Sequence, residues 1–218
     1  MTPLFLSLLT LTSACFANTC NKNPNHTYNC STAPHIVVDC LLTDLVDQKT
    51  TLQSKETSQK KFDQAVNSIV TEDILPSLDI DSMAARIVGR YNWKNSPESE
   101  KERLRVLLQD ITIQEYSDFI RKLDKNYPIK FYPSRRVNKE NTQIYGIMQD
   151  GKKAITIGFY MSCKVPDSSK IEAWQINDLT VENISFIDQM RLSLAATVRN
   201  DGLKGLNDKL EAELTKEN

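Results

Sequence analysis

Residues 144–163 read IYGIMQDGKKAITIGFYMSC and decide the expected fold. Apolar side chains alternate with other residues on both sides of Asp150-Gly151, a dipeptide that favours tight two-residue hairpins. The residues expected on one face are Ile144, Gly146, Met148, Ile155, Ile157, Phe159 and Met161. Alternation on both sides of a tight turn predicts two antiparallel strands with one shared apolar face.

Helical patterns flank this hairpin on both sides. Apolar residues recur every three or four positions before it and after it, while a short alternating run precedes it and another follows it. The pattern predicts helices over 34–52, 58–75, 81–90 (capped by Asp81), 97–123, 185–199 and 203–214, and further strands at 129–131 and 171–181. The last two helices are expected to break at Asp201-Gly202. Helices, an antiparallel sheet of about four strands and more helices predict a single α+β domain.

The charge balance argues against nucleic-acid binding. The 218 residues include 27 Lys and Arg against 28 Asp and Glu, and 40% are hydrophobic. A nucleic-acid-binding domain needs a basic surface to neutralise phosphates, and no such excess is present. The composition is that of an ordinary globular protein.

The first residues predict export. Residues 1–17 carry no charged side chain, contain an apolar run and end in small residues, as a signal peptide does. The apolar run is too short to span a bilayer, which takes roughly 20 residues. Lipid anchoring at Cys15 is less favoured, because Thr12 stands where a lipoprotein box usually has Leu or Val. Residues 18–33 then form a polar, cysteine-containing extension.

Four cysteines remain after signal removal. Cys20, Cys30, Cys40 and Cys163 are an even set, which in an oxidising compartment predicts two disulfides. Three pairings are possible; the spacing invites Cys20–Cys30 as a local loop and Cys40–Cys163 as a long-range bridge. A metal site is not expected, since the chain has no CxxC motif and only two histidines.

No catalytic constellation emerges from the sequence. His26 and His35 lie in or beside the extension, and no nucleophile elbow, zinc-protease motif or phosphate-binding loop is present. The abundance of apolar faces suits either a packed core or a container for an apolar ligand, and periodicity does not separate the two.

Two stretches resemble the MlaC family, also called toluene-tolerance proteins. They are IVTEDILPSLDIDSMAARIVGRYNWKNS at 69–96 and WQINDLTVENISFIDQMRLSLAATVRNDGLKGLNDKL at 174–210, and the resemblance extends over residues 33–214. The chain departs from the family pattern at Leu104 and Leu108, where Phe is common, and at Glu182-Asn183, where Glu-Gly is usual. The segment before Pro34 has no recognised counterpart.

The resemblance implies an MlaC-like domain over 34–214 that binds phospholipid in the periplasm, as cargo and without a cofactor. It further implies docking to an inner-membrane ABC transporter complex and to an outer-membrane lipoprotein with a porin. A small α+β enzyme and a periplasmic chaperone or adaptor remain the alternatives. Expected lipid-lining residues are Ile69, Ile87, Tyr91, Trp93, Leu104, Leu108, Ile111, Ile144, Met148, Ile155, Ile157, Phe159, Trp174 and Met190. Tyr91 and Trp93 are expected to form a hinge and a wall at this cavity, with a plain core position as the alternative for Trp93.

Overall fold

A computed structural model describes most of the chain. It covers Cys20 and residues 22–23, 26–55, 58–122, 129–138, 140–150, 153–165 and 172–217. The predicted signal peptide, 1–17, lies outside the described residues. Within them, no helix combines the length and the hydropathy that crossing a bilayer requires.

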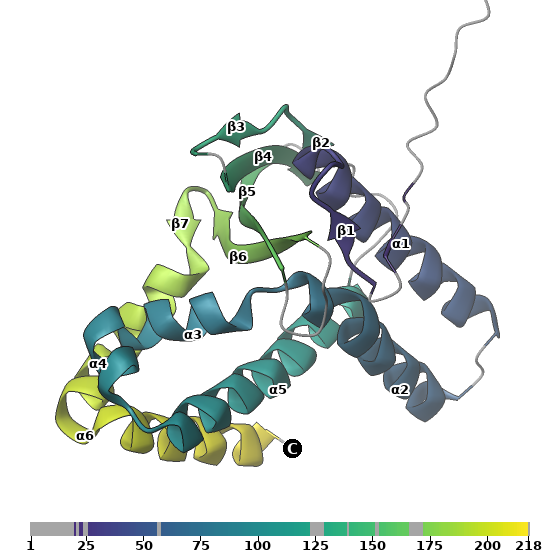
Figure 1. The fold of residues 1–218 in the computed structure, drawn as a ribbon. Coiled ribbons are helices and arrows are strands. Elements are labelled where there is room, and N and C mark those ends of the chain that lie inside the picture. The colour runs from purple at the N-terminus through teal and green to yellow at the C-terminus, as the bar shows by residue number, and fades with distance from the viewer. Residues whose placement is uncertain are drawn as a thin grey trace, which may run out of the picture.

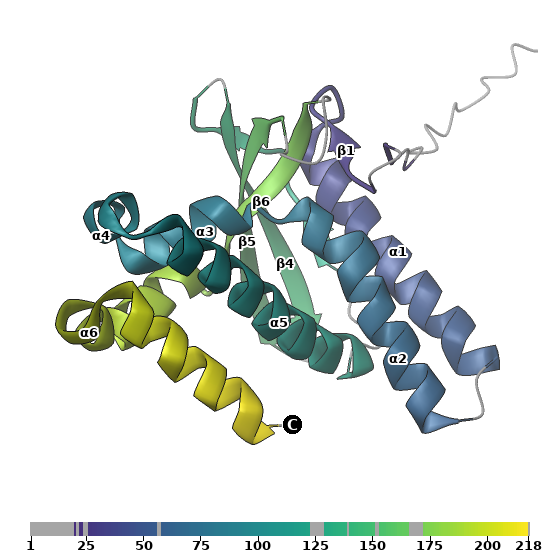
Figure 2. The ribbon, with the colours of Figure 1, turned by 60° about the horizontal axis from the view of Figure 1, so that its bottom comes forward.

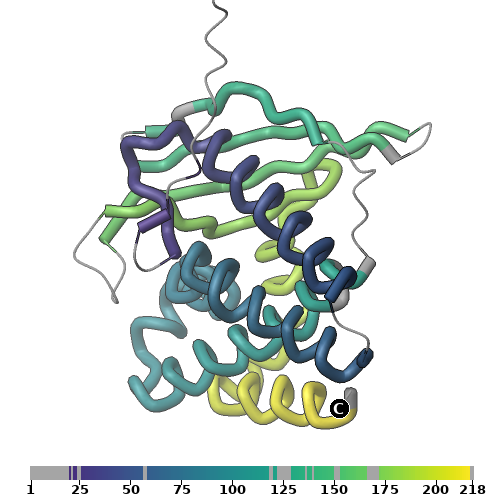
Figure 3. The backbone as a smooth tube through the Cα atoms, turned by 90° about the vertical axis from the view of Figure 1, so that its right-hand side faces the viewer, coloured from purple at the N-terminus to yellow at the C-terminus, as the bar shows by residue number. Residues whose placement is uncertain are grey.

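An antiparallel sheet forms one side of the molecule, as Figure 1 and Figure 3 show. Its main strands are β2 (Ile129–Phe131), β4 (Asn141–Asp150), β5 (Lys153–Lys164) and β6 (Ala173–Val181). Three two-residue strands complete it in the described residues: β1 (Tyr28–Asn29), β3 (Arg135–Arg136) and β7 (Ile184–Ser185). The order is β1-β6-β5-β4-β2, with β3 added to β4 and β7 to β6. The four predicted strands are confirmed, whereas the three short ones were not predicted.

The register of β4 and β5 confirms the predicted hairpin. The strands pair from Asn141↔Ser162 to Asp150↔Lys153, so the connection is residues 151–152, which lie outside the described residues. Phe159 stands opposite Ile144, Ile157 opposite Gly146 and Ile155 opposite Met148. Side chains of directly opposed residues project from the same face, so the alternation in the sequence produces one shared apolar face.

Helices occupy the rest of the molecule. They are α1 (Pro34–Lys55), α2 (Gln59–Ile69), the π-helical turn η1 (Val70–Ile74), the 3₁₀ turn η2 (Leu75–Ser77), α3 (Ile80–Val88), α4 (Arg90–Asn95), α5 (Glu98–Lys122) and α6 (Phe186–Glu217). In Figure 2, α1 and α2 run side by side, and α5 lies between them and the C-terminal half of α6. Buried residues of α1, α3, α5 and α6 form one core with the sheet, among them Val37, Ile87, Leu104, Ile144 and Leu206.

Two of the predicted helices differ from the structure in detail, and the predicted break in the last helix is confirmed. The cap of α3 is Asp79 and not Asp81, because the Asp79 carboxylate accepts a hydrogen bond from the backbone N–H of Ser82 at 3.1 Å. The predicted helix 58–75 changes to a π-helical turn at Val70. The predicted break in the last helix is confirmed at Gly202, whose φ of 67° and ψ of −164° are non-helical.

Two disulfides fix the N-terminal extension. Cys20 bonds to Cys40 in α1, and Cys30 bonds to Cys163 in β5. The expected pairing in two disulfides is therefore present, but the Cys20–Cys30 and Cys40–Cys163 pairs that the spacing invited are wrong. The reason is the position of β1 in the sheet. Tyr28 of β1 pairs with Trp174 of β6, and Trp174 pairs on its other side with Cys163 of β5. Cys30, which follows β1, therefore lies next to Cys163.

Polar contacts hold the extension against α1 and η1. The ammonium of Lys22 lies 2.6 Å from the carboxylate of Asp73 and 3.0 Å from that of Asp44. Gln48 donates to Asp73 at 2.9 Å, and His26 Nδ1 lies 3.2 Å from the same carboxylate. Burial alone would raise the pKa of Asp73, but the contacts with Lys22, Gln48 and His26 outweigh it and lower this pKa below its usual value.

The Asp73 contacts predict a pH-dependent stability. Asp73→Asn should lower the free energy of unfolding by about 1–2 kcal/mol at neutral pH, because charged hydrogen bonds to a buried group are lost. A lowered folded-state pKa contributes stability above the unfolded value near 3.8, and this contribution is lost as the pH falls through the folded-state pKa. The free energies of unfolding of the variant and the wild type, measured in urea, should therefore converge progressively as the pH falls below about 4. The exposed Asp47→Asn serves as the control, and an effect of Asp73→Asn that is independent of pH would contradict the assignment.

Candidate functional site

The apolar face of the sheet carries a strip of aromatic and aliphatic side chains. Ile129 and Phe131 lie over Gly146, where a Cβ would come within 2.9 Å of both side chains. Any larger residue at Gly146 would displace them. The rings of Phe131 and Phe159 lie 6.1 Å apart and tilted by 59°. We call Ile129, Phe131, Met148, Ile155, Ile157 and Phe159 the sheet strip.

Burial changes along this face. Ile144 and Met161, near one end of the hairpin, are fully buried in the core. Met148, Ile155 and Ile157, toward the turn of the hairpin, are only partly buried. Apolar side chains side by side on one face and still partly open to solvent leave hydrophobic surface that a ligand could cover.

A narrow apolar slot lies between the helices beneath the sheet. It is lined by residues of α3, α5 and the start of α6, chiefly Ile80, Met83, Leu108, Ile111, Tyr116 and Met190. Its volume is about 30 Å³, about the share of one water molecule in the liquid. An acyl chain therefore needs the helices to separate before it can enter.

Asp178 fixes the junction of sheet and helices beside the slot. This carboxylate is 2% exposed and accepts hydrogen bonds from Arg86 of α3 at 2.8 Å, from Ser185 at 2.6 Å and from the backbone N–H of Ile187 at 3.2 Å. The last bond satisfies a free N–H at the start of α6. Burial, followed by the negative charge of Asp178, raises the pKa of Tyr116 in the slot wall.

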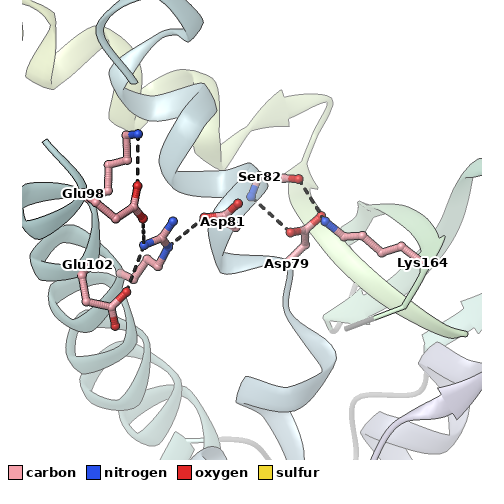
Figure 4. A network of polar contacts seen from close by, with 8 residues as sticks. Asp79, Asp81, Ser82, Glu98, Glu102 and Lys164 are labelled. Carbon is pink, nitrogen blue, oxygen red and sulfur yellow. Dashed lines mark hydrogen bonds and ion pairs between the residues drawn. The ribbon is translucent and has the colours of Figure 1, made fainter. Parts of the chain in front are cut away.

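Charged contacts join the start of α3 to both neighbouring layers, as Figure 4 shows. On one side, the Asp79 carboxylate meets the ammonium of Lys164 in β5. On the other, Asp81 accepts a hydrogen bond from Arg105 of α5 at 2.8 Å, and Arg105 also contacts Glu98 and Glu102. These contacts tie the wall of the slot to the sheet and to α5.

The expected lipid-lining residues separate into four places. Met148, Ile155, Ile157 and Phe159 belong to the sheet strip. Ile87, Leu108, Ile111 and Met190 line the slot. Ile69, Leu104, Ile144 and Trp174 are buried in the core, and the indole of Trp174 donates a hydrogen bond to the Thr32 carbonyl at 2.9 Å. Tyr91 and Trp93 lie on α4, apart from the sheet strip.

Tyr91, expected to form part of a hinge and wall at the cavity, lies at the surface of the described structure. Its side chain is 80% exposed, because Gly89, with a φ of 87°, ends α3 and starts the separate short helix α4. Trp93 is partly buried against the core, with Lys101 5.8 Å and Arg105 5.3 Å from its ring centre. A cation near the ring face is attracted by its negative potential, so Trp93 joins α4 to α5.

Sequence reasoning missed Tyr116 and Met83 as slot residues. Tyr116 follows Leu108 by eight positions, and this helical spacing places both on one side of α5. The described residues offer one group with ligand atoms close enough for a metal, Cys30, Cys163 and Glu172. Because both sulfur atoms are in a disulfide, they are not the thiolates that metal ions bind.

The fold and the sheet strip define a class of protein, an α+β domain in which a sheet with one apolar face packs with a helical layer. The family model described as "MlaC protein" matches residues 45–212, and the chain therefore belongs to the MlaC family. A solved structure of a phospholipid-binding protein from Ralstonia solanacearum, in complex with a phospholipid, shares the fold with a TM-score of 0.69. It is 13% identical and covers 85% of this chain and 98% of its own. No curated protein sequence matches the chain.

Proposed function

We propose that this protein carries phospholipid through the periplasm, between outer-membrane and inner-membrane complexes, and so maintains the lipid asymmetry of the outer membrane. The observation that carries the proposal is the partly exposed sheet strip in a chain of the MlaC family. The shared fold with a phospholipid-binding protein supports it. The partners would be an inner-membrane ABC transporter complex and an outer-membrane lipoprotein with a porin. The signal peptide at 1–17 would direct export.

The energetics of lipid transfer require such a carrier. A diacyl lipid exposes on the order of 30 methylenes, so release into water costs roughly 24 kcal/mol at about 0.8 kcal/mol each. Transfer from a bilayer to an apolar pocket exchanges one hydrocarbon environment for another. The carrier therefore needs binding and release without any chemical step.

The acyl chains would contact the sheet strip and enter the slot when the helices separate. Met148, Ile155 and Ile157 are already partly exposed, and the slot offers a second apolar lining between α3, α5 and α6. The headgroup would remain in solvent at the mouth.

The buried carboxylates favour a carrier over a hydrolase or an isomerase. A catalytic acid or base needs a reactive carboxylate in the pocket, kept apart from a permanent ion pair. Asp79 lies against Lys164, and Asp178 against Arg86. Both carboxylates therefore hold elements of the fold together.

The cargo can be measured directly. Protein purified without detergent should carry about one phospholipid per chain, or a four-chain lipid if the slot opens widely, because the apolar surface is covered during export and purification. Native mass spectrometry before and after solvent extraction would give the mass and identity of the ligand. Well-folded protein that releases no phosphorus-containing lipid would contradict the proposal.

A further inference from the structure

A second concave site lies away from the sheet strip, between α3–α4 and α6. It is a groove of about 320 Å³. Val88, Ala195 and Val198 form its floor, and Asn92, Arg191 and Arg199 surround it. Figure 1 and Figure 2 both show α4 beside α6 at one end of the molecule.

The two arginines form a regular pattern on α6. Arg191, Ala195 and Arg199 are spaced by four residues, which places them on one side of the helix. Eight residues separate the two arginines, or about 12 Å along the axis. Two guanidinium groups at this spacing, with an alanine between them, suit two carboxylates of one partner segment.

Both arginines are available to a partner. Arg199 is exposed and makes no ion pair with any described residue. Arg191 lies 3.4 Å from Asp188, but the two side chains are 54% and 52% exposed. Exposed ion pairs of this kind contribute little to stability, so Arg191 can exchange Asp188 for a carboxylate of a partner.

Large apolar side chains stand next to the groove residues. Tyr91, 80% exposed, precedes Asn92, and Leu192, 68% exposed, follows Arg191. They are the most exposed large hydrophobic residues in the described part of the chain. Tyr and Arg are enriched among the residues that dominate binding energies at protein interfaces. The exposed side chain of Tyr91 is therefore better explained by contact with a protein partner than by contact with lipid.

The polar surface of the groove indicates which kind of ligand it binds. Val88 and Val198 are 4% and 7% exposed, so the surface open to a ligand is mostly arginine and amide. Such a surface does not suit an acyl chain. A concave groove also receives a protruding segment better than a flat bilayer. We infer that this groove docks an acidic segment of a protein partner, with two carboxylates about 12 Å apart bound by Arg191 and Arg199.

Site-specific cross-linking in the native host tests the inference, which rests on the proposed function only in requiring a docking partner. A photoreactive phenylalanine analogue replaces Tyr91 in the full chain, and the cross-linked peptide is identified by mass spectrometry. We expect a protein segment with at least two Asp or Glu. Arg191→Glu/Arg199→Glu should lower the yield about tenfold or more, and changing the two carboxylates of the segment to Lys should restore it.

Matched controls separate docking from folding and from cargo. Lys60→Glu/Lys61→Glu makes the same charge change on exposed α2 and should leave the yield unchanged. If circular dichroism shows that the double arginine variant is unfolded, Arg199→Gln alone replaces it and should lower the yield severalfold. The inference is overturned by cross-links to phospholipid only, to a second copy of this chain or to a segment without acids. It is also overturned by a yield no higher than with the analogue at Lys60. Phospholipid content is measured on the same samples. A chain without lipid contradicts the proposed carrier function, whereas the docking inference is judged from the cross-links alone.

Discussion

Replacing Cys30 and Cys163 with serine should lower the free energy of unfolding by about 4–5 kcal/mol. The bond closes a loop with a sequence separation of 133 residues, and a cross-link over such a distance strongly restricts the unfolded chain. It also anchors β1, whose Tyr28 is 1% exposed beside Trp174. Guanidinium unfolding at neutral pH under non-reducing conditions would measure the change.

The other disulfide supplies the comparison. Cys20→Ser/Cys40→Ser opens a loop with a sequence separation of only 20 residues, for which the same reasoning gives about 3 kcal/mol. The Cys30–Cys163 variant should therefore be the less stable of the two. A larger loss from the Cys20–Cys40 variant would show that contacts of the extension, and not loop length, govern its contribution.

Ile157→Asp should remove the lipid and leave the protein folded. Ile157 lies on the sheet strip opposite Gly146 and is partly exposed, so a carboxylate there can reach water when no lipid is bound. Against acyl chains the same charge is unpaired and costs several kcal/mol. Each 1.4 kcal/mol is a tenfold change in binding, so the lipid content should fall at least tenfold. Lipid extraction and a circular dichroism melt on the same sample would measure both effects.

Ala154→Asp is the matched control for this variant. Ala154 is exposed on the same strand, and its side chain projects from the opposite face, so lipid content should be unchanged. An unfolded Ile157→Asp protein would indicate a packed core at this position. A stable variant with its full lipid load would show that Ile157 contacts neither core nor lipid.

Elements determined by neighbouring residues could be predicted from the sequence. The β4–β5 hairpin follows from alternation around Asp150-Gly151, and the break in α6 follows from Gly202, which adopts a positive φ without a steric penalty. The shared face of Ile155, Ile157 and Phe159 follows from the two-residue period of a strand. Local sequence is sufficient for these features because few distant contacts compete with them.

Features that depend on distant contacts could not be predicted. The disulfide pairing depends on β1 reaching β6, and nothing within residues 18–33 reveals that destination. Asp79 and Asp81 are equally good caps by composition; only the start of the turn, fixed by packing against β6, selects Asp79. The exposure of Tyr91 likewise depends on the direction in which α4 leaves α3. Periodicity also did not divide the expected lipid-lining residues between the sheet strip, the slot and the core.

The disulfides interleave along the chain, and this order has a consequence for biogenesis. If the chain is exported from its N-terminus as proposed, Cys20 and Cys30 meet an oxidant first, although neither is the native partner of the other. Cys163 follows Cys30 by 133 residues, which at ordinary rates of synthesis is roughly 7 to 27 seconds. A bond formed early between Cys20 and Cys30 must be reopened by thiolate attack through a mixed disulfide before both native bonds exist. For a chain exported as proposed, we therefore expect a thiol–disulfide isomerase to speed the formation of both native bonds.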